Sequence, residues 1–222
     1  MNAILEKIAE CVEAGKVNLA SPFPLQMKDQ PGADEYTQEA LKEGVSPNDI
    51  LNQALIPAMN RIGQKFSEHK IFVPEMLISA KAMSASMHHL KPYFKTGEVK
   101  RKGAFIVGTV FGDLHDIGKN LVSMIIEGAG WEVIDLGVNV KTEKFVNAVQ
   151  QHPGAVVGIS ALLTTTMNNM APVVKAVKEI FPTTKIIVGG SPLSSEFAQS
   201  IGADAYARDP QEGVKWLASL VA

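Results

Sequence analysis

The sequence predicts an N-terminal four-helix bundle followed by an α/β domain with a doubly wound, flavodoxin-like sheet of five parallel strands. Before about residue 100, apolar residues recur at the spacing of a helix. After it, short apolar runs alternate with amphipathic stretches. Such alternation indicates a parallel sheet with both faces covered. We therefore expect a helical cap domain over residues 1–91, a linker over 92–102 and an α/β domain over 103–222.

The composition excludes several classes of protein. The chain has 222 residues, 46% of them hydrophobic, and a formal net charge of −2, which is ordinary for a globular protein and atypical of a nucleic-acid binder. A single cysteine, Cys11, excludes an intramolecular disulfide framework and a cysteine-only metal cluster. The apolar runs are too short to cross a membrane, and the first ten residues lack the apolar core of a secretory signal. We expect a cytoplasmic protein.

The helical half begins with two predicted helices, over Ala3–Ala14 and Asp34–Lys42, separated by a loop that holds three prolines. Ser46 and Pro47 then mark a strong helix start, because serine can cap a helix and proline suits its first position. The third helix is expected to run to about Glu68.

Proline also shapes the rest of this half. Pro57 should kink the third helix, since proline removes a backbone donor and clashes with the carbonyl one turn back. Pro74 should open the fourth helix, which together with the other three makes a small bundle. The segment KPYFKTGEVKRK that follows is charged and contains one proline and one glycine, which favours an interdomain linker.

The second half predicts five strand–helix units. The expected strands are 104–110, Glu132–Leu136, Ala155–Ser160, Lys185–Val188 and Ala203–Tyr206. The expected helices are Lys119–Gly128, Thr142–Gln150, Met167–Phe181, Ser195–Ile201 and Pro210–Leu220. A chain of such units favours the strand order 2-1-3-4-5.

In such a sheet, ligands bind beyond the carboxyl ends of the strands, where the strand order reverses. The loop after the first strand, FGDLHDIGKN, brings Asp113, His115 and Asp116 together before a helix. The loop after the third strand, SALLTTT, has four hydroxyl groups in seven residues. The fourth strand ends in Gly189 and Gly190, where the missing side chains let a ligand approach the backbone.

A histidine beside a carboxylate is either a general base or a metal ligand with an orienting partner. The chain has no G-x-S-x-G elbow, no P-loop, and Ser160 where a phosphoryl-accepting domain needs aspartate. A metal ligand is the best interpretation, yet one histidine without cysteine holds a free ion poorly. The metal should therefore arrive inside a cofactor, either a haem or a corrinoid macrocycle.

These residues resemble the D-x-H-x-x-G…S-x-L…G-G signature of cobalamin-binding domains. Here it runs through Asp113–Gly118, Ser160–Leu162 and Gly189–Gly190, with 41 and 26 residues between the three parts. The chain is similar to cobalamin-dependent methionine synthase and to the corrinoid proteins of anaerobic methyltransferase systems. Those families also place a four-helix cap before the domain, so the resemblance covers nearly the whole chain.

The resemblance implies a role for each residue. His115 would be the lower axial ligand of cobalt, in place of the cofactor's own dimethylbenzimidazole, and Asp113 would accept a hydrogen bond from the other imidazole nitrogen. Thr166 stands where methionine synthase carries the serine that completes this relay. Leu114, Asp116, Ile117 and Gly118 belong to the same cofactor-binding motif. The displaced nucleotide tail would be lined by Ser160, Leu162, Thr164, Gly189 and Gly190.

In the cap, FSEHKIFVPEM resembles the stretch that covers the upper face of the corrin, with Phe66 and Val73 as the covering side chains. Several of these residues also have simpler interpretations. Asp116 favours a helix N-terminus electrostatically, Ser160 and Thr164 suit local caps, and the glycine pair suits a turn.

The function implied is that of a methyl carrier on cobalamin. A substrate-specific methyltransferase would load the methyl group, and a second methyltransferase would pass it to tetrahydrofolate or a thiol. A reductive activator would restore oxidised cobalt. We expect no turnover by the chain alone. The alternatives are a cobalamin-binding mutase subunit, which usually lacks the helical cap, and a cobalamin-dependent sensor, which would need a DNA-binding domain.

Overall fold

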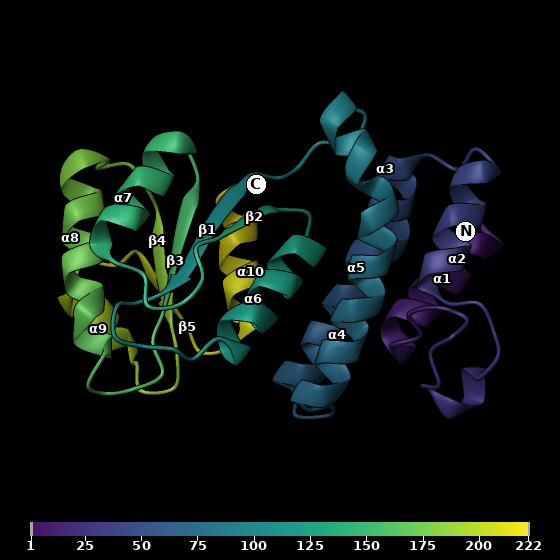
Figure 1. The fold of residues 1–222 in the computed structure, drawn as a ribbon, viewed down its shortest axis with the longest axis horizontal. Coiled ribbons are helices and arrows are strands. Elements are labelled where there is room, and N and C mark those ends of the chain that lie inside the picture. The colour runs from purple at the N-terminus through teal and green to yellow at the C-terminus, as the bar shows by residue number, and fades with distance from the viewer. Residues whose placement is uncertain (1, 222) are drawn as a thin grey trace. The chain divides into compact units, whose positions relative to one another are not determined.

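The computed structural model describes residues 2–221, apart from the side chain of Lys95. The chain divides into two compact units (Figure 1). The first, called here the helical unit, comprises Met1–Arg101 with Gly128–Gly130. The second, the α/β unit, comprises Lys102–Glu127 with Trp131–Ala222. No helix within residues 2–221 is long and apolar enough to cross a membrane.

In the helical unit, α1 packs against α2, α4 and α5. Their shared core is apolar and includes the buried side chains of Ile8, Val12, Leu55, Met76 and Leu90. The elements of this unit are α1 (Ala3–Ala14), η1 (Leu25–Met27), α2 (Ala33–Lys42), α3 (Pro47–Asp49), η2 (Ile50–Leu55), α4 (Ile56–Ser67) and α5 (Val73–Thr96).

A π-helical segment lies just before Pro57, where the sequence led us to expect a kink. Ser46 caps the backbone N–H of Asn48, as expected, but the helix then widens into the π-helical segment η2 before α4 begins. The N–H of Ile56 reaches back to the carbonyl of Leu51, five residues earlier. Since Pro57 has no N–H and would clash one turn back, the wider turn accommodates its ring.

The fourth helix, α5, extends into the segment that the sequence analysis assigned to the linker. It continues through Pro92 to Thr96 and ends at Gly97, whose φ of 80° is left-handed. Pro92 removes a single helical hydrogen bond close to the end, which the helix tolerates. Beyond the helix, Val99 is buried and its N–H donates to the carbonyl of Tyr93.

The α/β unit contains the expected all-parallel sheet, and its order β2-β1-β3-β4-β5 confirms the predicted topology. The strands are β1 (Ala104–Thr109), β2 (Glu132–Asp135), β3 (Val156–Ser160), β4 (Ile186–Gly189) and β5 (Ala205–Ala207). The helices are α6 (Ile117–Gly128), α7 (Thr142–Gln151), η3 (Met167–Asn169), α8 (Met170–Ile180), α9 (Ser195–Ser200) and α10 (Pro210–Ser219).

Helices cover the two faces of this sheet unequally. On one face, α7, α8 and α9 pack against the strands around a closed core that contains Phe145, Val157 and Val173 (Figure 1). On the other face lie α6 and α10 (Figure 1). An open cavity lies between these helices and the sheet. The unequal packing leaves room for a ligand on one side of the sheet.

Candidate functional site: a cofactor site at the carboxyl edge of the sheet

The register of the strands gathers the predicted site loops at one edge. Thr109 at the end of β1 pairs with Ser160 at the end of β3, and Ser160 pairs with Gly189 at the end of β4. Because the strands are parallel, the loops that follow them leave the sheet side by side. The three motif segments, separated by dozens of residues in sequence, therefore start from neighbouring positions.

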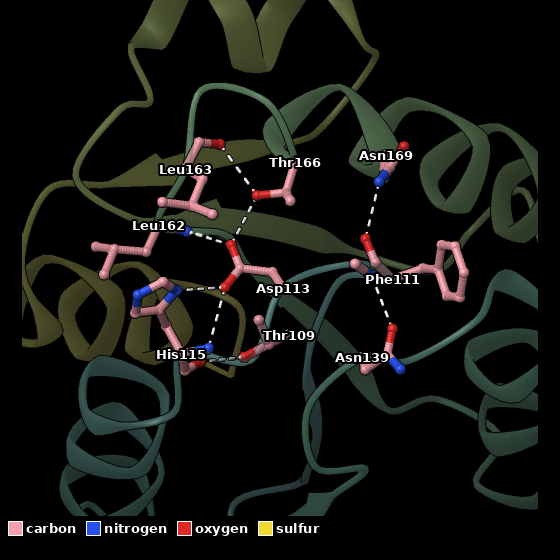
Figure 2. A network of polar contacts seen from close by, with 10 residues as sticks. Thr109, Phe111, Asp113, His115, Asn139, Leu162, Leu163, Thr166 and Asn169 are labelled. Atoms are coloured by element: carbon pink, nitrogen blue, oxygen red, sulfur yellow. Dashed lines mark hydrogen bonds and ion pairs between the residues drawn. The ribbon is translucent and has the colours of Figure 1, made fainter.

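Asp113 lies at the centre of a polar network between two of these loops (Figure 2). Its carboxylate is fully buried. One oxygen accepts hydrogen bonds from the Thr166 hydroxyl at 2.7 Å and from the Leu162 N–H at 2.9 Å. The other accepts from the His115 N–H at 3.0 Å and lies 2.7 Å from His115 Nδ1. The structure thus brings together Asp113, His115 and Thr166, as the sequence indicated.

These donors keep Asp113 ionised. Burial alone would raise the pKa of the carboxyl. The hydrogen bonds from Thr166, Leu162 and His115 lower it by a larger amount, so the pKa lies well below its ordinary value. An ionised carboxylate only accepts hydrogen bonds, so Nδ1 of His115 carries the proton of the bond between them. In the neutral imidazole, the lone pair is then on Nε2.

His115 is held so that this second nitrogen remains available. Its carbonyl accepts a hydrogen bond of 2.9 Å from the hydroxyl of Thr109, which is fully buried at the end of β1. Its side chain is 48% exposed, and no residue of 2–221 forms a hydrogen bond with Nε2. The imidazole is therefore a fixed, oriented donor of one nitrogen lone pair.

A cavity of about 630 Å³ lies beside His115, a volume typical of small-molecule sites. Most of the residues predicted at the cofactor line it, namely Leu114, His115, Asp116, Ile117, Gly118, Ser160, Leu162, Gly189 and Gly190. Asp113 is buried behind His115 and is not one of the lining residues.

Sequence reasoning missed two walls of this cavity. One is formed by α6 through Leu121, Val122 and Ile126, and the other by the segment Arg208–Pro210 after β5. The second wall could have been found, because the carboxyl end of β5 lies at the same edge as the ends of the other strands. The first depends on which face of α6 is turned to the sheet.

Two glycines that line the cavity allow close contacts that a side chain would prevent. A Cβ at Gly190 would collide with the carbonyl oxygen of Ala161, so the loops after β3 and β4 pack backbone to backbone. A Cβ at Gly158 would collide with the ring of Phe105, which lies across β3 from the adjacent strand. Gly158 and Phe105 both line the cavity.

The same edge carries unusually exposed apolar side chains. Leu114 and Ile117, on either side of the His115–Asp116 pair, are 72% and 68% exposed. Leu162, Leu163 and Phe111 are also exposed, and all five belong to the loops after β1 and β3 or to the first residue of α6. Large exposed apolar groups gathered in one region typically mark a binding surface.

Three predicted site residues lie elsewhere. Thr164 is exposed on the loop after β3 and does not line the cavity. Phe66 is half-buried near the end of α4, and Val73 is the first residue of α5, both in the helical unit. The turn between those helices also exposes Phe72. The contacts predicted for Thr164, Phe66 and Val73 stay predictions.

Comparison with known proteins identifies the family of this chain. Residues 103–215 match the protein family described as B12 binding domain, and residues 26–91 match a second family with the same description. Dimethylamine corrinoid protein 2 of Methanosarcina acetivorans is 37% identical over 179 residues, which cover 79% of this chain and 83% of the relative. The chain belongs to the B12-binding corrinoid protein family.

Further relatives agree with this assignment. Monomethylamine corrinoid protein 2 of Methanosarcina acetivorans is 38% identical over 190 residues, covering 83% of this chain and 88% of the relative. The structure of the methanol:cobalamin methyltransferase complex MtaBC from Methanosarcina barkeri matches 99% of this corrinoid protein and 80% of that chain, with a TM-score of 0.82 and 26% identity. A cobalamin-binding protein from Desulfitobacterium hafniense matches 98% of both chains, with a TM-score of 0.75 and 25% identity.

The residues present fit the cobalamin that this family binds. Within residues 2–221, no group of three or more histidine, cysteine or acidic side chains could hold a free metal ion. A cobalt ion already held by a corrin ring needs only one further protein ligand, and the oriented Nε2 of His115 has the right chemistry for it. The exposed apolar side chains around His115 suit the apolar face of a macrocycle, and the cavity beside it suits a nucleotide tail.

Proposed function

We propose that this corrinoid protein is a methyl carrier that binds cobalamin in the base-off, His-on mode, with His115 as the lower axial ligand. It accepts a methyl group from a substrate-specific methyltransferase and gives it up to a second methyltransferase that uses tetrahydrofolate or a thiol. The observation that carries this proposal is the 2.7 Å bond between His115 Nδ1 and the buried Asp113 carboxylate. That bond supports Nε2 as the free, basic nitrogen of the pair.

When bound, cobalamin supplies a cobalt ion that can accept and release a methyl group. The chain's part is to hold His115 beneath it and to exclude water around it. Asp113 orients the imidazole and increases its basicity, and Thr166 orients Asp113 through its 2.7 Å hydrogen bond. Thr166 thus takes the place of the relay serine in methionine synthase, since its hydroxyl reaches the same carboxylate.

The proposed seat of the corrin is the apolar edge around His115. Leu114, Ile117 and Leu162 present apolar surface there, which binding would remove from water at about 25 cal/mol per Å². The nucleotide tail then enters the cavity beneath that edge, between the sheet and helices α6 and α10, where Ser160, Gly189 and Gly190 line its mouth.

On the resemblance of the segment FSEHKIFVPEM alone, we propose Phe66 and Val73 as the side chains that cover the upper face of the corrin. A large apolar side chain above the cobalt excludes water and protects a bound methyl group. Replacement of Phe66 by alanine should therefore speed photolysis of the methylated holoprotein without abolishing cobalamin binding. An unchanged photolysis rate would contradict the assignment of Phe66.

The ligand assignment is tested by electron paramagnetic resonance of the Co(II) holoprotein labelled with ¹⁵N in its histidine rings. The wild type should show hyperfine splitting from one histidine nitrogen, and His115→Ala should lose it. His89→Ala is the matched control, because His89 bonds to Asp34 in the helical unit. Splitting that persists in His115→Ala would overturn the proposal.

The carrier role is tested by methyl transfer. Relatives named for monomethylamine, dimethylamine and trimethylamine are 38%, 37% and 35% identical, so similarity does not separate these donors. Reduced holoprotein should take up one methyl group per cobalt from one member of a panel of methylamines and methanol, once its methyltransferase is added. Sustained turnover by the purified holoprotein alone would contradict the carrier role.

A further inference from the structure

Two asparagines hold the main chain that leads into Asp113 (Figure 2). The side-chain Oδ1 of Asn139 accepts a hydrogen bond of 2.8 Å from the backbone N–H of Gly112. The backbone N–H of Asn139 donates to the carbonyl of Asp113 at 2.9 Å. Asn169 donates from its Nδ2 to the carbonyl of Phe111 at 2.8 Å. The peptide groups of Phe111–Asp113 are thus bonded on both sides of Gly112.

The two asparagines come from different loops. Asn139 lies between β2 and α7, whereas Asn169 ends the short helix η3, which directly follows Thr166. The N–H of Asn169 also donates to the carbonyl of Thr166 at 2.9 Å. The turn that contains Thr166 and Asn169 therefore forms two hydrogen bonds with the β1–α6 loop. Thr166 bonds to the carboxylate of Asp113, and Asn169 bonds to the main-chain carbonyl of Phe111.

The backbone conformation explains why this segment needs holding. Gly112 has a φ of 83° and Asn139 a φ of 53°, both in the left-handed region. That region is accessible to glycine, and asparagine is among the few other residues that adopt it readily. The hydrogen bonds from the two asparagine side chains hold the loop in this conformation.

We propose that Asn139 and Asn169 are positioning residues that preset the Asp113–His115 pair for the lower face of cobalamin. The inference rests on the proposed ligation by His115. Hydrogen bonds fix the carboxylate of Asp113 at its oxygens, while the asparagines fix the main chain from which it projects. The direction of the His115 imidazole is thereby set before cobalamin binds, and no ordering of the loop is needed at that moment.

The side-chain amide of Asn139 accepts a hydrogen bond, whereas that of Asn169 donates one. The same substitution, asparagine to aspartate, should therefore have different effects at the two positions. Asn139→Asp keeps an oxygen acceptor for the N–H of Gly112, whereas Asn169→Asp loses the donor and sets a carboxylate against the carbonyl of Phe111. Both substitutions add one negative charge near the site, so each controls for the charge of the other. Asn139→Gly keeps the left-handed backbone accessible but removes the acceptor.

The measurements are made on the holoprotein. The fraction of Co(II) ligated by histidine is followed by the hyperfine splitting from ¹⁵N-labelled rings, and the Co(II)/Co(I) midpoint potential by titration. Asn139→Gly and Asn169→Asp should each weaken His115 ligation about tenfold, at the lower end of the range for partners of metal ligands. A tenfold loss corresponds to about 59 mV for a one-electron couple, towards more positive potential because ligated Co(II) is less stabilised. Asn139→Asp should behave as the wild type.

Each outcome has a defined meaning. Wild-type splitting and potential in both Asn139→Gly and Asn169→Asp would overturn the positioning role and leave the proposed function intact. Equal effects of Asn139→Asp and Asn169→Asp would also overturn it, since charge alone would explain them. Absence of histidine splitting in the wild type would instead overturn the proposed function. If Asn139→Gly fails to fold by circular dichroism, the two aspartate variants still decide the question.

Discussion

Asp113 and Asp204 lie at opposite edges of the same sheet, and each has a pKa below its ordinary value, but they are stabilised differently. Asp113 follows β1 at the carboxyl edge and is bonded by a hydroxyl, two backbone N–H groups and an imidazole. Asp204 precedes β5 at the amino edge and is bonded by Lys178 at 2.6 Å, Lys185 at 3.3 Å and the N–H of Ile186 at 2.8 Å.

The difference indicates that Asp204 has a structural role, whereas Asp113 can influence the His115 imidazole to which it bonds. The charge of Asp204 is balanced by two lysines, and its contacts tie α8 and β4 to the start of β5. Among the side chains that the structure describes, no lysine or arginine bonds to Asp113, so its negative charge acts on the imidazole of His115. A buried carboxylate satisfied by uncharged donors keeps its electrostatic effect for the imidazole that it orients.

The largest expected effect is on cofactor ligation. Asp113→Asn removes the charge and turns an amide group towards donors that need an acceptor, so His115 should lose about 10–100-fold in affinity for Co(II). Asp204→Asn should leave ligation unchanged. Histidine hyperfine splitting in the Co(II) holoproteins measures both. Comparable losses in the two variants would show that the distinction between the two carboxylates is wrong.

The next effect is on stability and its pH dependence. Burial raises the pKa of Asp204, but the bonds from Lys178, Ile186 and Lys185 lower it below its ordinary value. The folded state therefore binds this proton more weakly than the unfolded state does, and Asp204 contributes stability above about pH 4 that is lost as the pH falls below it.

Asp204→Asn should accordingly reduce the free energy of unfolding at pH 7 by about 2 kcal/mol. This value allows for solvent screening, because the Asp204 side chain is 20% exposed. Below pH 4 the difference from the wild type should shrink. Urea unfolding of the apoprotein at pH 7 and pH 3.5 measures both values. A difference that is constant with pH would show that the charge of Asp204 is not what stabilises this edge.

A smaller effect is expected at Thr166. Thr166→Val keeps the shape of this buried side chain but removes the hydroxyl that bonds to Asp113, which should reduce the free energy of unfolding by about 1 kcal/mol. Thr166→Ser keeps the hydroxyl and should retain ligation of Co(II) by His115, whereas the valine variant should weaken it. Equal splitting in the valine and serine variants would remove Thr166 from the relay.

The smallest effect concerns the exposed apolar residues of the carboxyl edge. Leu114→Ser should change the stability of the apoprotein by less than about 0.5 kcal/mol, since this side chain is already exposed. It should nevertheless weaken cobalamin binding about fivefold, through loss of about 1 kcal/mol of apolar contact. Ile180→Ser, at the amino edge, should change neither. Equilibrium titration with cobalamin measures the affinity of each variant, and urea unfolding of the apoprotein measures its stability.

The sequence was most informative where local patterns repeat. The strand–helix alternation predicted the sheet and its order, and the parallel topology then placed the loops with Asp113, Ser160 and Gly189 at one edge. It was less informative about the helical half, where the π-turn before Pro57 and the passage of α5 through Pro92 depend on packing that no local pattern records.

Within the site, the resemblance located His115, Asp113 and Thr166, and the structure places all three in one network. Asn139 and Asn169 were not singled out, because their partners are main-chain groups 27 and 58 residues away in sequence. An asparagine that bonds to a peptide group looks the same in the sequence as one that faces solvent. The wall at Arg208–Pro210 was missed although the strand rule could have indicated it.

Phe105 and Gly158 both line the cavity, and the tip of the Phe105 ring lies against the position where a side chain at residue 158 would stand. A Cβ at residue 158 would collide with the tip of the Phe105 ring, so even a single methyl group there would force the ring or the strand to move. The space that we propose for the nucleotide tail therefore depends on a residue that has no side chain to bond to a ligand. If the tail occupies this cavity as proposed, Gly158→Ala should weaken the binding of cobamides with a bulky lower base more than the binding of cobamides with a small one.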